Sequence, residues 1–144
     1  MRREFPKRPI VGVGGIVIHR ERALLVRRGK PPLMGEWSIP GGMLELGEEL
    51  AAGVRRELKE ETGLDVEPLE CILVFDRIER GRKRVKYHYV ILDYLCRFKR
   101  GRLHPASDVI DARWVRREEL AQYHLTDLAH TLVLQAFAMM KKRR

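Results

Sequence analysis

The 144-residue sequence is poor in cysteine, and its apolar runs are short. Its two cysteines, Cys71 and Cys96, lack the spacing of metal ligands and lie in apolar segments typical of strands. We therefore expect both to be buried free thiols in a reducing compartment, which favours a cytoplasmic protein. Charged residues interrupt every apolar run before the ~20 residues that a membrane-spanning helix requires. A membrane protein is thereby excluded, and no membrane partner is expected.

Signals for export, internal repeats and linkers are lacking as well. The basic start, MRREFPKRP, is not followed by the apolar segment of a signal peptide, so residues 1–8 are predicted to form a flexible basic leader. Residues 141–144 are predicted to form a similar flexible basic tail. Without a repeat or a linker, residues 1–144 predict a single domain that is large enough to bury a core.

Acidic residues are outnumbered by basic ones. The 20 Asp and Glu residues stand against 29 Lys and Arg, which gives a formal net charge of +9. Such a charge attracts anionic partners, among them nucleotides, phosphates and RNA. Because much of the excess lies at the two ends of the chain, the charge permits a phosphate substrate and is only weak support for RNA.

The hydrophobic pattern predicts a mixed α/β fold. Apolar runs predict strands at Ile10–His19, Ala23–Arg28, Leu69–Glu79, Val85–Phe98 and Ile110–Val115, and a very short one at Trp37–Ile39. Helical periodicity predicts a helix from Gly47 or Glu48 to Thr62, helical turns at Arg117–Gln122, and a last helix from Thr126 or Asp127 to Met140. Prolines and glycines predict loops at Gly29–Gly35 and Pro40–Gly42, and Gly63 is placed to end the first long helix. These elements predict a sheet with helices packed on it in layers.

Three glutamates share one face of the first predicted helix. Glu57, Glu60 and Glu61 are spaced at i, i+3 and i+4, so their carboxylates repel one another unless a cation lies between them. Mg²⁺ and Mn²⁺ prefer such oxygen ligands and commonly act on phosphate substrates. The alternative is a solvated acidic face, but it leaves the preceding glycines and the outlying Glu48 unexplained.

The stretch Gly42–Leu64 carries a more specific pattern. It reads glycine, five residues, Glu48, seven residues, and then RELKEETGL. This resembles the signature of the Nudix hydrolases, G-x5-E-x7-R-E-U-x-E-E-x-G-U with U aliphatic, at every specified position. Seven fixed identities arise by chance on the order of 10⁻⁹ per starting position, so chance is not the explanation. The segments GEWSIPGG, ALLVRR, YHYVILDYLC and SDVIDARWVRREEL also resemble typical text of that family.

The resemblance implies a fold, a reaction and a set of site residues. The fold is an α/β/α sandwich around a mixed sheet, and the reaction is metal-dependent hydrolysis of a nucleoside diphosphate linked to another group. The implied ligands of Mg²⁺ or Mn²⁺ are the carboxylates of Glu57, Glu61 and Glu60 and the backbone carbonyl of Gly41. Glu48 and Arg56 resemble the supporting pair in which a guanidinium holds carboxylates in place.

The group that deprotonates the attacking water is left open by the resemblance. Some family members use a glutamate of the signature, which favours Glu60 or Glu57 here. Others use a carboxylate from a late loop, for which Asp108 and, less favoured, Asp111 are the candidates. A loop or capping role for Asp108 is an equally good interpretation.

Phosphate contacts are expected from basic residues near the first strands. Arg27 and Arg28 point to opposite faces of an extended strand, so only one of them can face a cleft, and Lys30 lies in the adjacent loop. Each of these is more often a solvated charge than a ligand. The aromatic residues that could stack on a base, although strand aromatics more often belong to a core, are Phe75, Tyr87, Tyr89 and Trp114.

The signature does not identify the substrate. ADP-ribose and other nucleotide sugars rank level with (deoxy)nucleoside triphosphates as the small-molecule nucleotide substrate. One alternative is an enzyme that removes pyrophosphate from the 5′ end of RNA, for which a basic patch beside the cleft would be evidence. Another is a non-catalytic sensor of nucleotides, which the presence of every signature carboxylate disfavours. A homodimer is also left open.

Overall fold

The computed structural model describes residues 3–31 and 33–143. Within these ranges one mixed sheet has the strand order β3-β2-β1-β6-β5, with β4 also paired to β1 and β7 to β2. The strands are β1 Ile10–His19, β2 Arg22–Arg28, β3 Trp37–Ser38, β4 Gly41–Met43, β5 Leu64–Arg80, β6 Val85–Gly101 and β7 Val109–Arg116. The helices are α1 Leu50–Thr62, the 3-10 helix η1 Arg117–Tyr123, and α2 Asp127–Lys142.

The two ends of β1 have different partners on one side. From Ile10 to Ile18 β1 runs parallel to β6, but on the other side Gly12–Gly14 pairs with β4, and Ile18 and His19 pair with β2. The expected loop at Pro40–Gly42 is therefore corrected, because Gly41 and Gly42 belong to a strand. Two adjacent glycines give no strand signal in the sequence, and only the pairing with β1 makes them extended.

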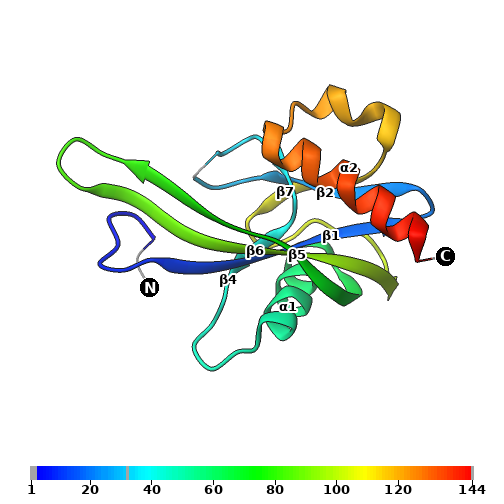
Figure 1. The fold of residues 1–144 in the computed structure, drawn as a ribbon, viewed down its shortest axis with the longest axis horizontal. Coiled ribbons are helices and arrows are strands. Elements are labelled where there is room, and N and C mark those ends of the chain that lie inside the picture. Colours follow the sequence, from blue (N-terminus) through cyan, green and yellow to red (C-terminus); the bar gives the residue numbers. More distant parts are fainter. Residues whose placement is uncertain (1–2, 32, 144) are drawn as a thin grey trace.

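The long helices cover opposite faces of the sheet (Figure 1). Val54 and Leu58 of α1 are fully buried against a cluster that includes Val13 of β1. Leu132 and Val133 of α2 are buried in a second cluster, with Ile16 and Leu95 among its members. The layers predicted from the sequence are thus present, with one apolar core on each side of the sheet.

The helix ends show which local signals were reliable. Gly63 ends α1 in the left-handed region with φ 77°, as predicted for a glycine cap. The Thr126 hydroxyl caps α2 by accepting a hydrogen bond from the Ala129 amide at 3.2 Å. The start of α1 was predicted too early, because the helix begins at Leu50 and not at Gly47 or Glu48. Glu48 instead belongs to the preceding turn, in which its amide donates to the Glu45 carbonyl.

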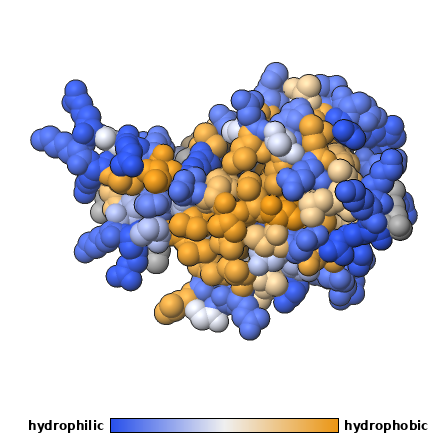
Figure 2. Space-filling view, in the orientation of Figure 1, coloured by the Kyte–Doolittle hydropathy of each residue, from blue (hydrophilic) through white to orange (hydrophobic). Residues whose placement is uncertain are grey.

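Strands β5 and β6 form a long hairpin that extends beyond the body of the molecule (Figure 1). Each has 17 residues, more than the sequence predicted, because Leu64 and Asp65 directly after α1 already pair with the end of β6. On the face shown in Figure 2, apolar surface spreads over the middle of the molecule and hydrophilic surface dominates the end of the hairpin. That end carries Arg82 and Arg84, and the Arg84 guanidinium lies 4.1 Å from the centre of the Phe5 ring.

One expectation about the cysteines needs correction. Cys96 is buried, and burial raises the pKa of its thiol to about 12, but Cys71 is exposed and not buried as predicted. At the ends of the chain, the Phe5 amide donates to the Lys86 carbonyl at 2.8 Å, and Arg143 forms an ion pair with Glu70 at 3.2 Å. Flexibility of the two ends stays a prediction, and residues 1, 2 and 144 lie outside the described ranges. No helix in those ranges has the length and apolar character needed to cross a bilayer.

Candidate active site

Arg56 of α1 is the centre of an acidic network. Its guanidinium donates to both carboxylate oxygens of Glu48, from Nε at 2.7 Å and from Nη2 at 2.9 Å. Nη1 donates to Glu57 at 2.8 Å, and Nη2 also donates to the Met43 carbonyl at 2.9 Å. The hydrogen bonds with Glu48 raise the pKa of Arg56 and hold the pKa of Glu48 below its usual range. Arg56 thus ties the helix, β4 and the turn before the helix into one arrangement.

Glu57 is the neighbour of Arg56 in the sequence, and its carboxylate lies against the first glycine of the signature. A Cβ atom at Gly42 would overlap both carboxylate oxygens of Glu57. Any larger residue at position 42 would therefore displace this carboxylate. Burial raises the pKa of Glu57, although the hydrogen bond from Arg56 opposes that rise.

Glu61 lies one helical turn further along and is 6% exposed. Its Oε1 accepts a hydrogen bond from the Gly41 amide at 2.9 Å. Burial raises the pKa of Glu61 to about 8, and the charge of Glu57 adds to the rise while the Gly41 amide opposes it. A Cβ atom at Gly41 would overlap the Val13 carbonyl, so this glycine lets β4 approach β1 and present its amide to Glu61.

Glu60 is separated from the other two glutamates of its face. Its side chain is 48% exposed and approaches Arg56 at 3.3 Å. Glu57 and Glu61 line a cavity, and Glu60 is absent from the lining among the described residues. The sequence predicted one shared acidic face, but burial beside β4 selects only two of its three carboxylates.

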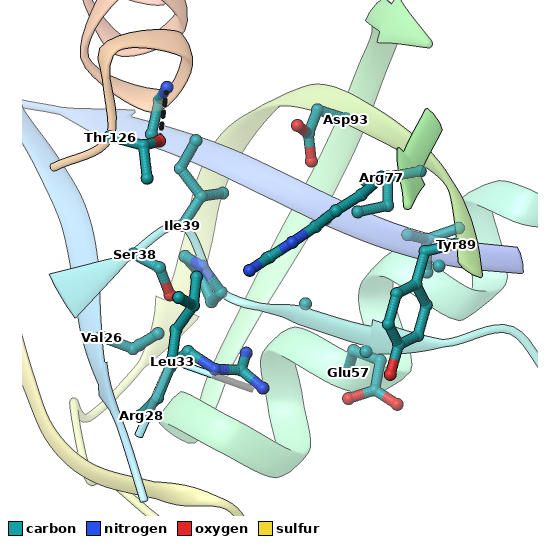
Figure 3. Close-up of a pocket in the computed structure, with 18 of the residues that line it drawn as sticks. Val26, Arg28, Leu33, Ser38, Ile39, Glu57, Arg77, Tyr89, Asp93 and Thr126 are labelled. Carbon is teal, nitrogen blue, oxygen red and sulfur yellow. Dashed lines mark hydrogen bonds between the residues drawn. The ribbon is translucent and has the colours of Figure 1, made fainter. Parts of the chain in front are cut away.

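The cavity has a volume of about 470 Å³, which is the size of many small-molecule sites. Glu57 and Glu61 form part of its wall, and residues of all seven strands, of the segments before β3 and β7 and of the start of α2 also line it. Figure 3 shows Glu57 on one side of it, with Ser38 and Arg28 on the other and the Arg77 side chain reaching across the middle. Carboxylates and arginines thus share one enclosure.

Of the predicted phosphate contacts, Arg28 is the one that lines the cavity. Burial lowers its pKa, as expected for a cation removed from water. Arg27 points away and donates from Nε to the Gly35 carbonyl at 2.9 Å, consistent with alternation along β2. Lys30 does not line the cavity either, but its ammonium pairs at 2.9 Å with Asp108, which does.

The two late carboxylates have different surroundings. Asp108 lines the cavity and also lies 3.9 Å from Arg3, so cations accompany it on two sides. Asp111 accepts a hydrogen bond from the Ala112 amide at 2.8 Å and pairs with Arg113 outside the cavity. Asp108 therefore stays a candidate for a catalytic role, and the position of Asp111 supports a local structural one.

The polar residues of the cavity wall that sequence reasoning missed include Arg3, Ser38, Arg77 and Asp93. Arg3 lies in the predicted flexible leader, and Arg77 is one of many arginines, so neither carried a signal. Asp93 did carry one, because it is the single charged residue in the apolar run YVILDYLC of β6. A charge at such a position must be paired or face a cavity.

One end of the cavity is formed by Glu57, Glu61 and Gly41 and is called the glutamate end below. Its residues fit a hard divalent cation. Among residues 3–31 and 33–143, no three carboxylate, imidazole or thiol side chains already converge as a ready-made metal site. However, Glu61 is buried and Glu57 is partly buried, burial disfavours the ionised form of both, and the backbone of Gly41 lies beside Glu61. A cation held by these oxygens would relieve both the burial of charge and the repulsion between the two groups.

Comparison with known proteins agrees with this geometry. A family model described as the NUDIX domain matches residues 8–137. The chain is 36% identical over 93 residues to a putative ADP-ribose pyrophosphatase, YjhB, of Bacillus subtilis, covering 65% of this chain and 43% of that protein. It is 32% identical over 109 residues to an ADP-ribose pyrophosphatase of Methanocaldococcus jannaschii, covering 74% of this chain and 61% of that protein. The chain thus spans less than two thirds of the length of these relatives.

A solved structure gives the same result for the fold. The crystal structure of a MutT NUDIX hydrolase from Burkholderia pseudomallei superposes with a TM-score of 0.76 at 28% identity, covering 90% of this chain and 98% of that chain. The sequence-based assignment is confirmed by the family model, by these relatives and by the fold. The signature at Gly42–Leu64, the cavity beside it and these matches lead to one conclusion: this chain belongs to the Nudix hydrolase family.

Proposed function

We propose that this protein is a metal-dependent pyrophosphohydrolase that cleaves a nucleoside diphosphate linked to a second group. The observation that carries the proposal is the placement of Glu57 and Glu61 in the wall of a cavity that Arg28 and Arg77 also line. A pyrophosphate is anionic and resists attack by water, so its hydrolysis requires charge neutralisation and an activated water. Buried carboxylates for a cation and arginines for phosphate oxygens are the two components that such a reaction needs.

Each part of the glutamate end has a proposed role. Glu57, Glu61 and the Gly41 carbonyl would hold Mg²⁺ or Mn²⁺, with Glu60 available from the exposed side of the helix. When bound, the cation would supply charge neutralisation at the phosphates and a more acidic water. Arg56 and Glu48 position Glu57 through the hydrogen bonds between them. The proton of the attacking water is proposed to pass to Glu57 or Glu60, with Asp108 as the candidate outside the signature.

The substrate class is proposed from the relatives. Two relatives of this chain carry the name ADP-ribose pyrophosphatase, one of them as putative, which favours ADP-ribose or a related nucleotide sugar. A relative from Streptomyces ambofaciens is described as MutT-like, and nucleoside triphosphates stay the second small-molecule candidate. Both types of substrate present a nucleoside and a pyrophosphate, which the cavity volume of about 470 Å³ can accommodate in large part.

Removal of 5′ pyrophosphate from RNA is a second candidate, and basic residues beside the cavity favour it. Arg3, Arg28 and Arg77 line the cavity, whereas Arg82 and Arg84 of the hairpin turn do not and give this candidate no support. Positive charge beside a cleft suits a polyanion.

A panel of nucleotide substrates tests these candidates. With Mg²⁺ or Mn²⁺ present, AMP plus ribose phosphate would identify ADP-ribose, and a nucleoside monophosphate plus pyrophosphate would identify a triphosphate. Monophosphorylated RNA would identify the RNA candidate. Full activity in excess chelator, or hydrolysis of none of these compounds, would reject the proposal and favour a nucleotide sensor.

A further inference from the structure

Asp93 is a buried carboxylate that the proposed reaction does not use. It lies on β6, is 6% exposed, and lines the same cavity as Glu57 and Glu61. Figure 3 places it on the far side of the Arg77 side chain from Glu57. Asp93 is therefore separated from the glutamate end but belongs to the same enclosure.

The Asp93 carboxylate has no partner among the described residues. Within residues 3–31 and 33–143 it takes part in no hydrogen bond or ion pair, and burial alone raises its pKa to about 6. Ser38, which lines the same cavity, has a fully buried hydroxyl that lacks a partner in those ranges, whereas Asp93 is 6% exposed and borders the cavity. Buried polar groups are nearly always hydrogen-bonded, and each exception destabilises the folded chain. A largely buried carboxylate that borders a cavity without a protein partner indicates a group that a ligand satisfies.

The neighbouring strand makes space for Asp93. Gly14 of β1 pairs with Asp93, and Gly12 pairs with Ile91, so two glycines lie beside two side chains of β6. A Cβ atom at Gly14 would overlap Oδ1 of Asp93, and therefore only glycine permits this position of the carboxylate. Both glycines also line the cavity, so β1 contributes no side chain to it at these two positions.

Apolar groups complete this part of the enclosure. Ile91 is two residues before Asp93 on the same face of β6, and Phe75 of β5 pairs with Ile91. Leu132 of α2 and Ile39 also line the cavity. A cavity with aromatic and aliphatic walls suits a planar heterocycle, and stacking on such walls commonly stabilises a base.

We infer that Asp93 is a specificity residue that accepts a hydrogen bond from the exocyclic amino group of the substrate's nucleobase. The inference rests on the proposed function in that the ligand is a nucleotide whose phosphates lie at the glutamate and arginine end. Adenine and guanine both carry such an amino donor at the edge of a flat ring. Hypoxanthine and unsubstituted purine do not.

Other ligand groups fit Asp93 less well. A phosphate would be repelled by an unpaired carboxylate, whereas arginines elsewhere in the cavity attract it. A hydroxyl-rich sugar would leave its remaining hydroxyls without partners against Ile91, Phe75 and Leu132. A cation would have a single carboxylate as its ligand there, since no other charged group contributes to the shift in the pKa of Asp93. An amino group on an aromatic ring satisfies the carboxylate and the apolar walls together.

Binding measurements on the whole chain test the inference without turnover. Isothermal titration calorimetry in excess chelator would compare ADP with purine riboside 5′-diphosphate, and GDP with IDP. The members of each pair differ in one amino group. Because a hydrogen bond to a charged group is lost, we expect the desamino nucleotide of at least one pair to bind roughly 10–100-fold more weakly.

Substitutions at Asp93 test whether this side chain causes the preference for nucleotides that carry the amino group. In Asp93→Leu, which is similar in size and has no acceptor, the preference should fall to less than about twofold. Asp93→Asn keeps one acceptor oxygen and should give an intermediate preference. Asp65→Leu is the control, because Asp65 lies outside the cavity and pairs with Lys59 and Arg100, and it should keep the wild-type preference.

Each outcome decides the inference. Equal affinities within both pairs for the wild-type protein, or no detectable binding of any of the four nucleotides, would overturn it. A preference that persists in a folded Asp93→Leu variant, checked by its thermal unfolding, would also overturn it. The wild-type comparison is informative even if the variant does not fold. A preference for amino-bearing nucleotides without hydrolysis of any substrate would support the inference and reject the proposed enzymatic function.

Discussion

The carboxylates at the glutamate end and at the Asp93 end of the cavity differ in their hydrogen-bond partners. At the glutamate end, Arg56 donates to Glu48 and Glu57, and the Gly41 amide donates to Glu61. At the Asp93 end, the carboxylate has no partner in the described part of the chain. Both ends use glycines to make room for a carboxylate, Gly42 for Glu57 and Gly14 for Asp93.

We interpret the difference as one between the proposed reaction centre and the proposed recognition surface. A group that takes part in chemistry must be held in one orientation, and several hydrogen bonds provide that rigidity. A group that selects a ligand gains specificity when it is left unsatisfied until the correct donor arrives, since a ligand without that donor leaves it unpaired.

The largest effect is expected from Glu57→Gln or Glu61→Gln. Each variant removes a charged oxygen from the proposed metal site while keeping the size of the side chain. We expect kcat to fall on the order of 10³-fold or more with an unchanged fold, measured by product release with Mg²⁺ or Mn²⁺. Glu67→Gln, on an exposed surface pair with Arg97, should retain activity. Wild-type turnover in either cavity variant would refute the role of the glutamate end.

Asp93→Asn should remove a pH dependence of stability. Burial raises the pKa of Asp93 to about 6, against an ordinary value of ~3.9 in the unfolded chain, so the folded state binds its proton more tightly. The wild-type free energy of unfolding should therefore fall, relative to the variant, as pH rises from about 4 to about 6. Above that range the difference should be constant, having changed by about 3 kcal/mol in total. Urea unfolding of both proteins from pH 4 to pH 8 measures this difference. A free energy of unfolding that depends on pH in the same way in both proteins would contradict the unpaired state of Asp93.

Arg56→Lys tests how far the glutamate end depends on geometry instead of charge. A lysine keeps the positive charge but cannot donate to Glu48, Glu57 and the Met43 carbonyl as a planar guanidinium does. We expect kcat/KM to fall roughly 10–100-fold, with apparent metal affinity falling as well. Arg55→Lys is the matched control on the neighbouring helical position. Equal activity of the Arg56 and Arg55 variants would show that the hydrogen-bond network is dispensable.

The smallest effect is expected from Ser38→Ala. This change removes a buried hydroxyl that has no partner in the described ranges, so the ligand-free protein should become more stable by roughly 1 kcal/mol. Thermal unfolding without nucleotide measures the change. A clear loss of stability would mean that the hydroxyl is satisfied in the free protein.

Local patterns were sufficient for most of the elements and for the glutamate end. The strand Ile10–His19 and the glycine cap at Gly63 were placed correctly because an apolar run and a left-handed backbone are short-range properties. The strand at Gly41–Met43 was missed, since pairing with β1 creates it. The start of α1 was misplaced, and Cys71 was wrongly predicted to be buried. Contacts with distant parts of the chain help to decide both the first residue of a helix and the exposure of a side chain.

The sequence by itself determined the family, the spacing of Glu48, Arg56, Glu57 and Glu61, and the expectation of a metal-dependent reaction. These residues lie within one turn and one helix, so their spacing along the chain fixes their spacing in space. Only the tertiary structure decided that Glu60 lies outside the cavity and that Arg28, not Arg27, faces it. It alone brought Asp93 and Ser38 into the same enclosure, because pairing across a sheet joins residues that are far apart in the sequence.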